Sequence, residues 1–326
     1  MLLVSSGTQP RHAVEPDAGA QDRVAGGVWI DLCEASDAER ALVERATGLR
    51  VPAREELSEI ENSSRLSAHA GVLTLSMPTV TRARGHSTIS PLGFVLSRER
   101  LLTVRYNEMP VFDSFAEEFP EGDRPRTAVA AFVGLLEAIG DHLADLLEHV
   151  AGELETISRR VFTPRGSDRK GRAREDALLQ ETLQSIGRAA DLVSHIRDSL
   201  LGVGRIAGYV YEAASDWTPA ELRSRFTTLR QDIASLNDYD AQMTNKAQFL
   251  LDATLGLINI QQNNGIRVLT VVSVVGVPPT LVASIYGMNF KDMPELNWSF
   301  GYYYGLTVIL LSAVLPLLWF RRRGWL

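Results

Sequence analysis

The sequence contains very little cysteine and has no excess of basic side chains. Its single cysteine, Cys33, excludes a disulfide framework and a cysteine metal cage, and predicts a small buried thiol in a reducing compartment. Lys and Arg number 33 against 40 Asp and Glu. Because phosphate binding requires clustered basic side chains, nucleic acid is not expected as a partner, and cations are favoured instead.

Patterns that would indicate an enzyme or a secreted protein are also missing. The six histidines are scattered, and no glycine-rich phosphate loop is visible, so neither catalysis nor an organic cofactor is predicted. The first residues, MLLVSSGTQPRH, have only four leading apolar positions before a polar stretch, which is too short for a signal peptide. Residues 1–266 are therefore expected to stay in the cytoplasm.

Charge is unevenly distributed along the chain. Residues 1–266 carry a net charge of −10, whereas residues 267–326 carry +3 and include 23 consecutive uncharged residues, Val268 to Phe290. This asymmetry predicts an α+β membrane protein in which a large acidic part precedes a membrane part.

The amino-terminal third predicts mixed structure. Residues 1–26 lack periodicity and predict a flexible tail. Residues 27–125 predict a cytoplasmic α/β domain, with strands in GVWIDL, GVLTLSMPTV and LGFVLSRERLLTVRY, the last turning at Ser97 to Arg100. Between them SDAERALVERATG, capped by Ser36 or Asp37, and PAREELSEIE predict short helices.

Residues 126–266 predict a helical hairpin and a stalk helix. The apolar spacing indicates helices over 127–162 and 175–209, and a third that begins near Thr218 and Pro219. No proline follows until Pro278, so the third helix is expected to run to about Tyr286, roughly 70 residues and about 100 Å. A helix of that length requires coiled-coil partners or a membrane.

Two segments predict transmembrane helices. Residues 268–285 and 302–320 are uncharged over 18 and 19 residues, and they place membrane helices at 267–286 and 302–320. Arg267 precedes the first span, and the arginine-containing tail 321–326 follows the second. By the positive-inside rule, both termini are predicted to be cytoplasmic. The loop 287–301 is then external. A pair of buried helices in a soluble core is the less favoured alternative.

The polar residues of the first span share one face. Steps of three and four residues connect a seam, here called the polar seam: Asn263, Ile266, Thr270, Ser273, Val277, Thr280 and Ser284. Two interpretations fit it, close packing of small residues between helices or a water-filled ion path. The path is favoured because the seam extends to Asn263, mixes hydroxyls with single apolar residues, and leads to the carboxamide of Asn289. Enclosing a path requires several copies of the chain.

The seam ends on Gly287, Met288 and Asn289. Neutral oxygen acceptors suit Mg²⁺, which keeps its water shell tightly, because they can bind the outer face of those waters without trapping the ion. Glu295 and Asp292 in the loop can attract cations, although Lys291 opposes them.

These features resemble the CorA family of magnesium and cobalt channels. The resemblance rests on YGMNF followed by MPEL between two carboxy-terminal spans, on PPTLVASIYGMNFKDMPELNWSFGY and LGLINIQQN, and on the order of domains. It implies a funnel-shaped homopentamer in the inner membrane. Gly287, Met288 and Asn289 then form the selectivity filter, and the polar seam lines the pore.

The resemblance also implies regulation. Cytoplasmic Mg²⁺ bridging neighbouring subunits would close the channel. The candidate ligands are stalk acids for which a solvated helix face is the favoured interpretation: Asp232, Asp238, Asp240 and Asp252. Arg321, Arg322 and Arg323 would form a basic ring around the stalk. Mg²⁺ is thus expected as transported and regulatory ion, with Co²⁺ and Ni²⁺ as further cargo. The alternatives are a proton-coupled zinc transporter and a membrane cation sensor that does not conduct.

Overall fold

The structure is a computed structural model that describes residues 1–6, 11–17, 19–59, 61, 65–83, 86–119, 127–163, 172–288 and 293–325. It divides into two compact units. The first comprises Met1–Gly171 with Gln180–Leu251, and the second comprises Arg172–Leu179 with Asp252–Leu326. Predicted residues Asn289, Lys291 and Asp292 lie outside the described ranges.

Strands and helices interleave before long helices take over. The strands are β1 (Leu2–Ser5), β2 (His12–Ala13), β3 (Trp29–Cys33), β4 (Leu66–His69), β5 (Val72–Ala83), β6 (His86–Leu96) and β7 (Leu101–Arg105). The helices are α1 (Ala20–Ala25), α2 (Asp37–Thr47), α3 (Arg54–Leu57), α5 (Pro110–Glu118), α6 (Ala128–Phe162), α7 (Arg172–Ala213), α8 (Ala220–Tyr286) and α9 (Gly301–Arg322), with the short 3₁₀ helix η1 (Pro294–Asn297).

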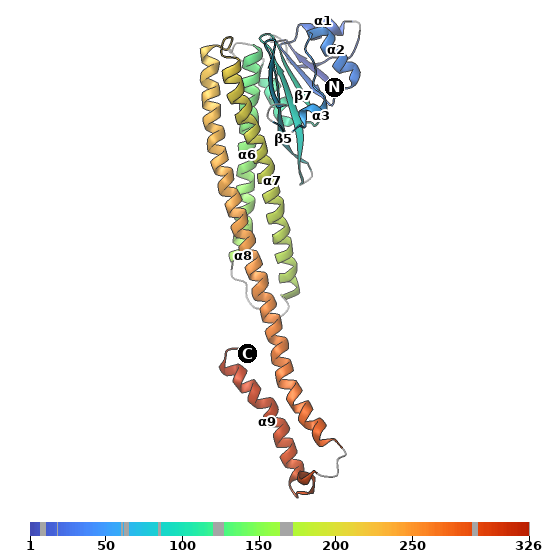
Figure 1. Ribbon diagram of the computed structural model, residues 1–326, viewed down its shortest axis with the longest axis vertical. Coiled ribbons are helices and arrows are strands. Elements are labelled where there is room, and N and C mark those ends of the chain that lie inside the picture. The colour runs from blue at the N-terminus through green and yellow to red at the C-terminus, as the bar shows by residue number, and fades with distance from the viewer. Residues whose placement is uncertain are drawn as a thin grey trace. The chain divides into compact units, whose positions relative to one another are not determined.

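One seven-stranded sheet organises the first unit, in the order β2-β1-β3-β7-β6-β5-β4 (Figure 1). β3 and β7 pair in parallel, with Trp29 opposite Leu101, whereas β5, β6 and β7 form antiparallel pairs. Side chains alternate between the two faces of the sheet, as the two-residue period of a strand requires. Trp29 and Leu101 join the cluster shared with α5 to α8, and Ile30 and Leu102 join the cluster shared with α1 to α3.

Local sequence signals have the predicted effects. Ser36 caps α2 in a capping box with Glu39, and Gly48 ends that helix at φ 70°, a left-handed conformation that glycine adopts without strain. The turn between β6 and β7 closes with a hydrogen bond from the Ser97 amide to the Arg100 carbonyl, 2.9 Å. The predicted helix starting at Pro52 is shorter than expected, because α3 covers only Arg54–Leu57.

The prediction of a flexible tail over residues 1–26 is wrong for its described part. β1 pairs antiparallel with β3, with Val4 opposite Ile30, and α1 packs nearby. Leu2 and Val4 are 1% and 0% exposed, so this segment completes the sheet. Four residues are too few to display a strand period in the sequence, and the pairing partner lies 26 residues away.

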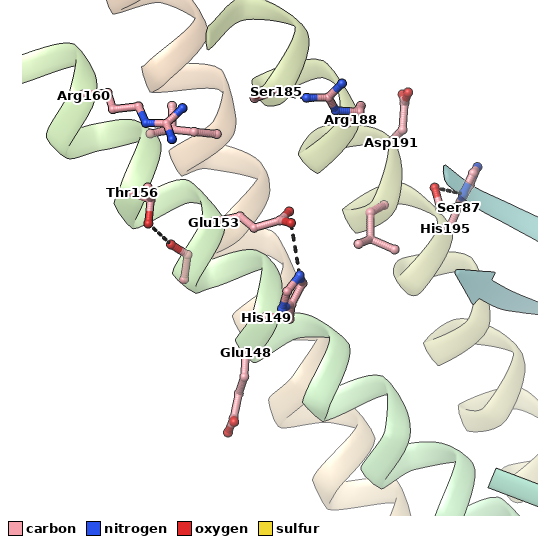
Figure 2. A pocket seen from close by; sticks show the side chains of 13 residues that line it. Ser87, Glu148, His149, Glu153, Thr156, Arg160, Ser185, Arg188, Asp191 and His195 are labelled. Carbon is pink, nitrogen blue, oxygen red and sulfur yellow. Dashed lines mark hydrogen bonds and ion pairs between the residues drawn. The ribbon is translucent and has the colours of Figure 1, made fainter. Parts of the chain in front are cut away.

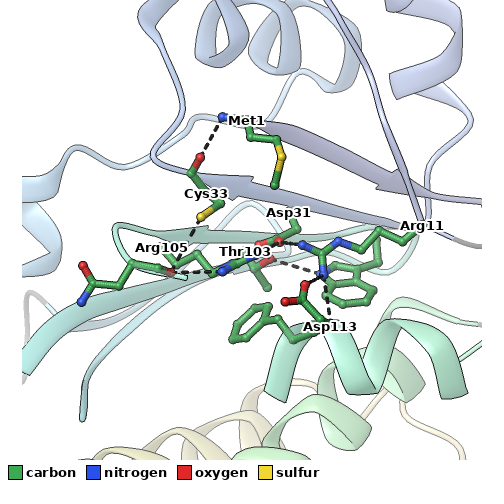
Figure 3. Close-up of polar contacts among 10 residues, drawn as sticks. Met1, Arg11, Asp31, Cys33, Thr103, Arg105 and Asp113 are labelled. Carbon is green, nitrogen blue, oxygen red and sulfur yellow. Dashed lines mark hydrogen bonds and ion pairs between the residues drawn. The ribbon is translucent and has the colours of Figure 1, made fainter. Parts of the chain in front are cut away.

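A buried ion network fixes this amino-terminal segment to the sheet (Figure 3). Asp31, 1% exposed, accepts hydrogen bonds from Arg11 Nη2 at 2.6 Å, Arg105 Nη2 at 3.0 Å and Thr103 Oγ1 at 2.7 Å. Arg11 Nη1 also donates to Asp113 of α5, 3.1 Å away. A carboxylate at this depth is stable only because two guanidinium groups surround it.

Helices α6, α7 and α8 pack against the face of the sheet that carries Trp29 and Leu101. α6 is capped by Thr127, whose hydroxyl accepts a hydrogen bond from the Ala130 amide, and it lies alongside α7 and α8 within the first unit (Figure 1). α8 is 67 residues long, as predicted, and begins at Ala220 directly after Pro219. The boundary between the units falls within this helix at Leu251 and Asp252, earlier than the predicted boundary at residue 266.

α7 approaches β5 closely at Gly202. A Cβ atom added there would lie 2.7 Å from the Cβ of Met77, closer than real Cβ contacts. We expect Gly202→Ala to lower the free energy of unfolding by about 1–3 kcal/mol, because the sheet and helix must separate. Gly208→Ala on the same helix is the control, since nothing lies within 4 Å of its added Cβ; it should raise that free energy by about 0.5–1 kcal/mol.

Urea unfolding of the purified protein, followed by circular dichroism, measures both effects. Equal changes for the two variants would contradict the close approach of α7 and β5.

Candidate cation path

Two helices of the second unit are long and apolar enough to cross a membrane. They are the carboxy-terminal part of α8 and the whole of α9, and only 6% of each apolar window is buried in the protein. Apolar side chains such as Leu269 and Leu281 are more than half exposed, at 67% and 59%. Such exposure over 18 residues suits lipid and does not suit a soluble core.

Except at Thr270, the polar seam lies on a face of α8 that the other described residues leave exposed. Thr270 is half-buried, and the other seam residues are exposed, with Ile266 and Val277 each at 62%. Apart from Thr270, the less exposed residues of the span follow a different line: Val271, Val275, Pro278, Pro279, Val282 and Tyr286. Among the described residues, the seam is therefore not closely packed against α9 of the same chain.

Three hydroxyl groups of the seam donate their hydrogens to carbonyl groups of α8. Thr270 Oγ1 donates to the Ile266 carbonyl at 2.9 Å, Thr280 Oγ1 to the Gly276 carbonyl at 2.9 Å, and Ser284 Oγ to the Thr280 carbonyl at 2.8 Å. Because these three hydroxyl hydrogens are used within the helix, the remaining lone pairs of the three oxygens are available as acceptors. A row of such acceptors is suited to cations and to the hydrogens of their water shells.

Pro278 and Pro279 both lie inside α8. A proline has no amide hydrogen, so the carbonyl groups one turn earlier lose their helical partners. Carbonyl oxygens freed in this way at the middle of a span are satisfied next to water or a cation and are costly in lipid.

α8 ends at the predicted Gly-Met-Asn sequence. The Gly287 amide still bonds to the Ala283 carbonyl, at 3.0 Å, and the Met288 amide bonds to the Ile285 carbonyl, at 3.2 Å. Both residues are exposed. Glu295 and Asp292 are the two loop acids predicted to attract cations, and the structure describes only Glu295. It lies in η1 and is half-buried.

The four predicted regulatory acids are not brought together. Asp232 and Asp238 are exposed on the part of α8 in the first unit, and Asp252 is exposed at the start of the second. Asp240 differs from the predicted exposed ligand, because it is 1% exposed and its Oδ2 accepts from Arg197 Nε at 2.7 Å. Burial raises the pKa of Asp240, and Arg197 opposes that rise. The sequence could not reveal this pair, since 43 residues separate its members.

Asp232 instead contributes to an acidic group with α6. Burial raises the pKa of Asp141, and the neighbouring charges of Glu137, Asp145 and Asp232 raise it further. Glu137 is paired with Arg225 of α8. Within the described ranges, no three His, Cys, Asp or Glu side chains are close enough to hold a metal ion.

A groove between α6, α7 and β6 was not predicted (Figure 2). Its volume is about 530 Å³, and two histidines line it. His149 Nε2 lies 3.1 Å from Glu153 Oε1, and His195 Nδ1 lies 3.0 Å from Ser87 Oγ. The four-residue spacing of His149 and Glu153 is the one sequence feature that could have indicated their contact, because side chains four positions apart on a helix are neighbours.

The predicted basic residues lie at the end of the second span. Arg321 and Arg322 are the last residues of α9, and the Arg323 guanidinium lies over the Trp319 ring, 5.4 Å from its centre. All three arginines are exposed.

Fold and site together define a class of protein: an α/β domain joined by a very long helix to a pair of membrane-length helices with an acceptor-lined face. The family model of the CorA-like Mg²⁺ transporter proteins matches residues 24–322. The chain belongs to this family, whose members are transporters and not enzymes.

Relatives agree with this assignment, and a solved structure shares the fold. The chain is 32% identical over 309 residues to the magnesium transport protein CorA of Escherichia coli strain K12, covering 93% of each chain. It is 32% identical over 311 residues to that of Pectobacterium atrosepticum, covering 94% of each. The fold resembles the complete CorA structure from Methanocaldococcus jannaschii with a TM-score of 0.76 and 20% identity, covering 100% of this chain and 99% of that one.

Proposed function

We propose that this chain transports Mg²⁺ through a passive channel formed by several copies of itself. The observation that carries the proposal is the polar seam, which is largely exposed on α8 and in which Thr270, Thr280 and Ser284 donate within the helix and keep their oxygens as acceptors. The names of the E. coli and Pectobacterium relatives, magnesium transport protein, support Mg²⁺ as the cargo.

The proposed pore repeats the polar seam of α8 around a common axis. Since one chain with two spans cannot enclose a path, the copies must be arranged in a ring, and the family resemblance favours five. Gly287, Met288 and Asn289 form the filter at the external end, and the acceptors of Asn289 bind the hydrated ion. Glu295 and Asp292 raise the local cation concentration.

The proposed orientation places both termini in the cytoplasm and the filter outside the inner membrane. Arginines at both cytoplasmic borders support it. Moving one charge through 100 mV is worth about 2.3 kcal/mol, so a divalent ion gains roughly 4.6 kcal/mol per 100 mV on entry. The membrane potential alone is then sufficient to drive uptake.

Regulation by cytoplasmic Mg²⁺ belongs to the same proposal. The exposed carboxylates of Asp232, Asp238 and Asp252 are the candidates for bridging neighbouring subunits. Asp240 is a weaker candidate, because ligation by it requires the release of Arg197. Co²⁺ and Ni²⁺ are expected to share the path, since the filter recognises a hydrated ion by its water shell.

Uptake by liposomes that contain the purified protein tests this function. We expect an imposed negative interior potential to drive Mg²⁺ entry, Co²⁺ to compete, and a pH gradient to have no effect. Zn²⁺ entry that requires a pH gradient would support a proton-coupled zinc transporter instead. Absence of any cation movement would support a sensor that does not conduct.

A further inference from the structure

The carboxyl-terminal residues form a specific turn at the end of α9. The Trp325 amide donates to the Phe320 carbonyl at 3.0 Å, and the Gly324 amide donates to the Arg321 carbonyl at 3.2 Å. Gly324 has φ 70°, the left-handed conformation. This is the Schellman arrangement, which satisfies the last carbonyl groups of a helix and reverses the chain direction. The sequence FRRRGW thus directs Trp325 back against its own helix.

Trp325 lies between two partners as a result. Its ring stacks on Phe320 with centres 5.3 Å apart and an angle of 24° between the planes. On α8, the Arg267 guanidinium lies over the same Trp325 ring, 5.4 Å from its centre. Phe320 is 3% exposed and Val271, one turn after Arg267, is 9% exposed, so this is a packed point in two spans that are otherwise largely exposed.

Arg267 occupies a sensitive position. It follows Ile266, a residue of the polar seam, and a guanidinium group stays charged at any physiological pH. Repeated around a ring of copies, a positive charge at that height would repel cations from the path. The contact with Trp325 holds this charge on the line of α8 that continues into Val271, away from the seam.

We propose that Arg267, Phe320, Gly324 and Trp325 form a carboxyl-terminal clamp that joins the cytoplasmic ends of the two spans and holds the Arg267 charge off the ion path. The role in ion passage rests on the proposed function, whereas the clamp itself rests on the contacts above. Trp325 and Arg267 are positioning residues, since neither contributes an oxygen to the path.

Thermal unfolding of the full-length protein in detergent tests the contact. Trp325→Leu and Arg267→Gln should each lower Tm by about 2 °C, and the double variant should lower it no further than one single variant, because both remove the same cation–π contact. Trp319→Leu is the matched control, since Trp319 lies at the same membrane border, is 53% exposed, and contacts Phe320 and Arg323 but not Arg267.

Mg²⁺ uptake by liposomes tests the consequence. Trp325→Leu should lower the initial rate by about fivefold, the factor that corresponds to roughly 1 kcal/mol of lost coupling. Adding Arg267→Gln in that background should restore most of the rate, because the freed charge is then absent. Trp319→Leu should stay near the unmodified rate.

The outcomes separate the two proposals. Additive changes in Tm, or an unchanged rate for Trp325→Leu in a protein that transports, would overturn the clamp. Shared loss of Tm together with no Mg²⁺ movement in any variant, including the unmodified protein, would support the clamp and reject the channel.

Discussion

Replacing Asn289 with alanine is expected to lower Mg²⁺ uptake by at least about tenfold, because each copy of the chain loses an acceptor worth roughly 1 kcal/mol at the proposed filter. The effect should appear in the initial rate at low Mg²⁺ concentration, where capture of the ion limits entry. Asn289→Gln keeps the carboxamide but places it one methylene group further from the backbone. Its uptake rate should therefore lie between those of the unmodified protein and Asn289→Ala. Liposome uptake at a fixed potential measures all three.

Asn297 provides the matched control for this experiment. It is also an asparagine of the loop that connects α8 and α9, but it lies exposed in η1, ten residues after Gly287. Asn297→Ala should leave uptake within about twofold, as expected for a solvated surface amide. A similar loss for both variants would show that uptake depends on the loop as a whole, and Asn289 would not be the filter residue.

The largest expected change in stability comes from Asp31. Asp31→Ala leaves Arg11 and Arg105 buried without their shared carboxylate, with side chains 7% and 2% exposed. Removing one partner of a buried ion pair costs about 3–5 kcal/mol, since the remaining charge stays in a poorly solvated site. We expect that loss in the free energy of unfolding, measured with urea in detergent.

Asp113→Ala is the control for Asp31→Ala. Asp113 binds the same Arg11, but its side chain is 66% exposed, so its loss should cost less than about 1 kcal/mol. Asp31→Asn, which keeps the shape and one acceptor, should fall between them and remains measurable if the alanine variant fails to fold. Equal midpoints for Asp31→Ala and Asp113→Ala would contradict a network centred on Asp31.

Local signals explain why much of the fold could be predicted. Ser36 with Glu39, Gly48 and the turn from Ser97 to Arg100 act over a few residues, so their effects are visible in the sequence. The long helix was visible because no proline interrupts the chain between Pro219 and Pro278. These features lie within one turn or one helical period, which is the range of sequence patterns.

Distant pairings explain what the sequence did not reveal. β1 forms a strand because it pairs with β3, which lies far from it in the sequence. Arg11 is stabilised in its buried position by its ion pair with Asp31. The sequence predicted an exposed side chain for Asp240, since no local feature indicates its ion pair with Arg197 of α7. Contacts between residues far apart in the chain leave no periodic trace.

The candidate site divides in the same way. The seam is one face of one helix, so its residues could be assigned by spacing, and the structure adds the hydrogen bonds of three of its four hydroxyl groups. The clamp joins Arg267 to Trp325, 58 positions later, and depends on the reversal at Gly324. The turn is local to the last residues of α9, whereas the partner on α8 is distant in the sequence.

Thiol modification of the seam during transport tests the cation path most directly. In a background with Cys33, which is buried, replaced by serine, Thr280→Cys places a thiol on the seam and Leu281→Cys places one on the adjacent apolar face. A positively charged thiol reagent added outside the liposomes should reduce Mg²⁺ uptake through Thr280→Cys to background and leave Leu281→Cys unaffected. Uptake that persists in treated Thr280→Cys, or falls equally in both variants, would contradict a cation path along the polar seam of α8.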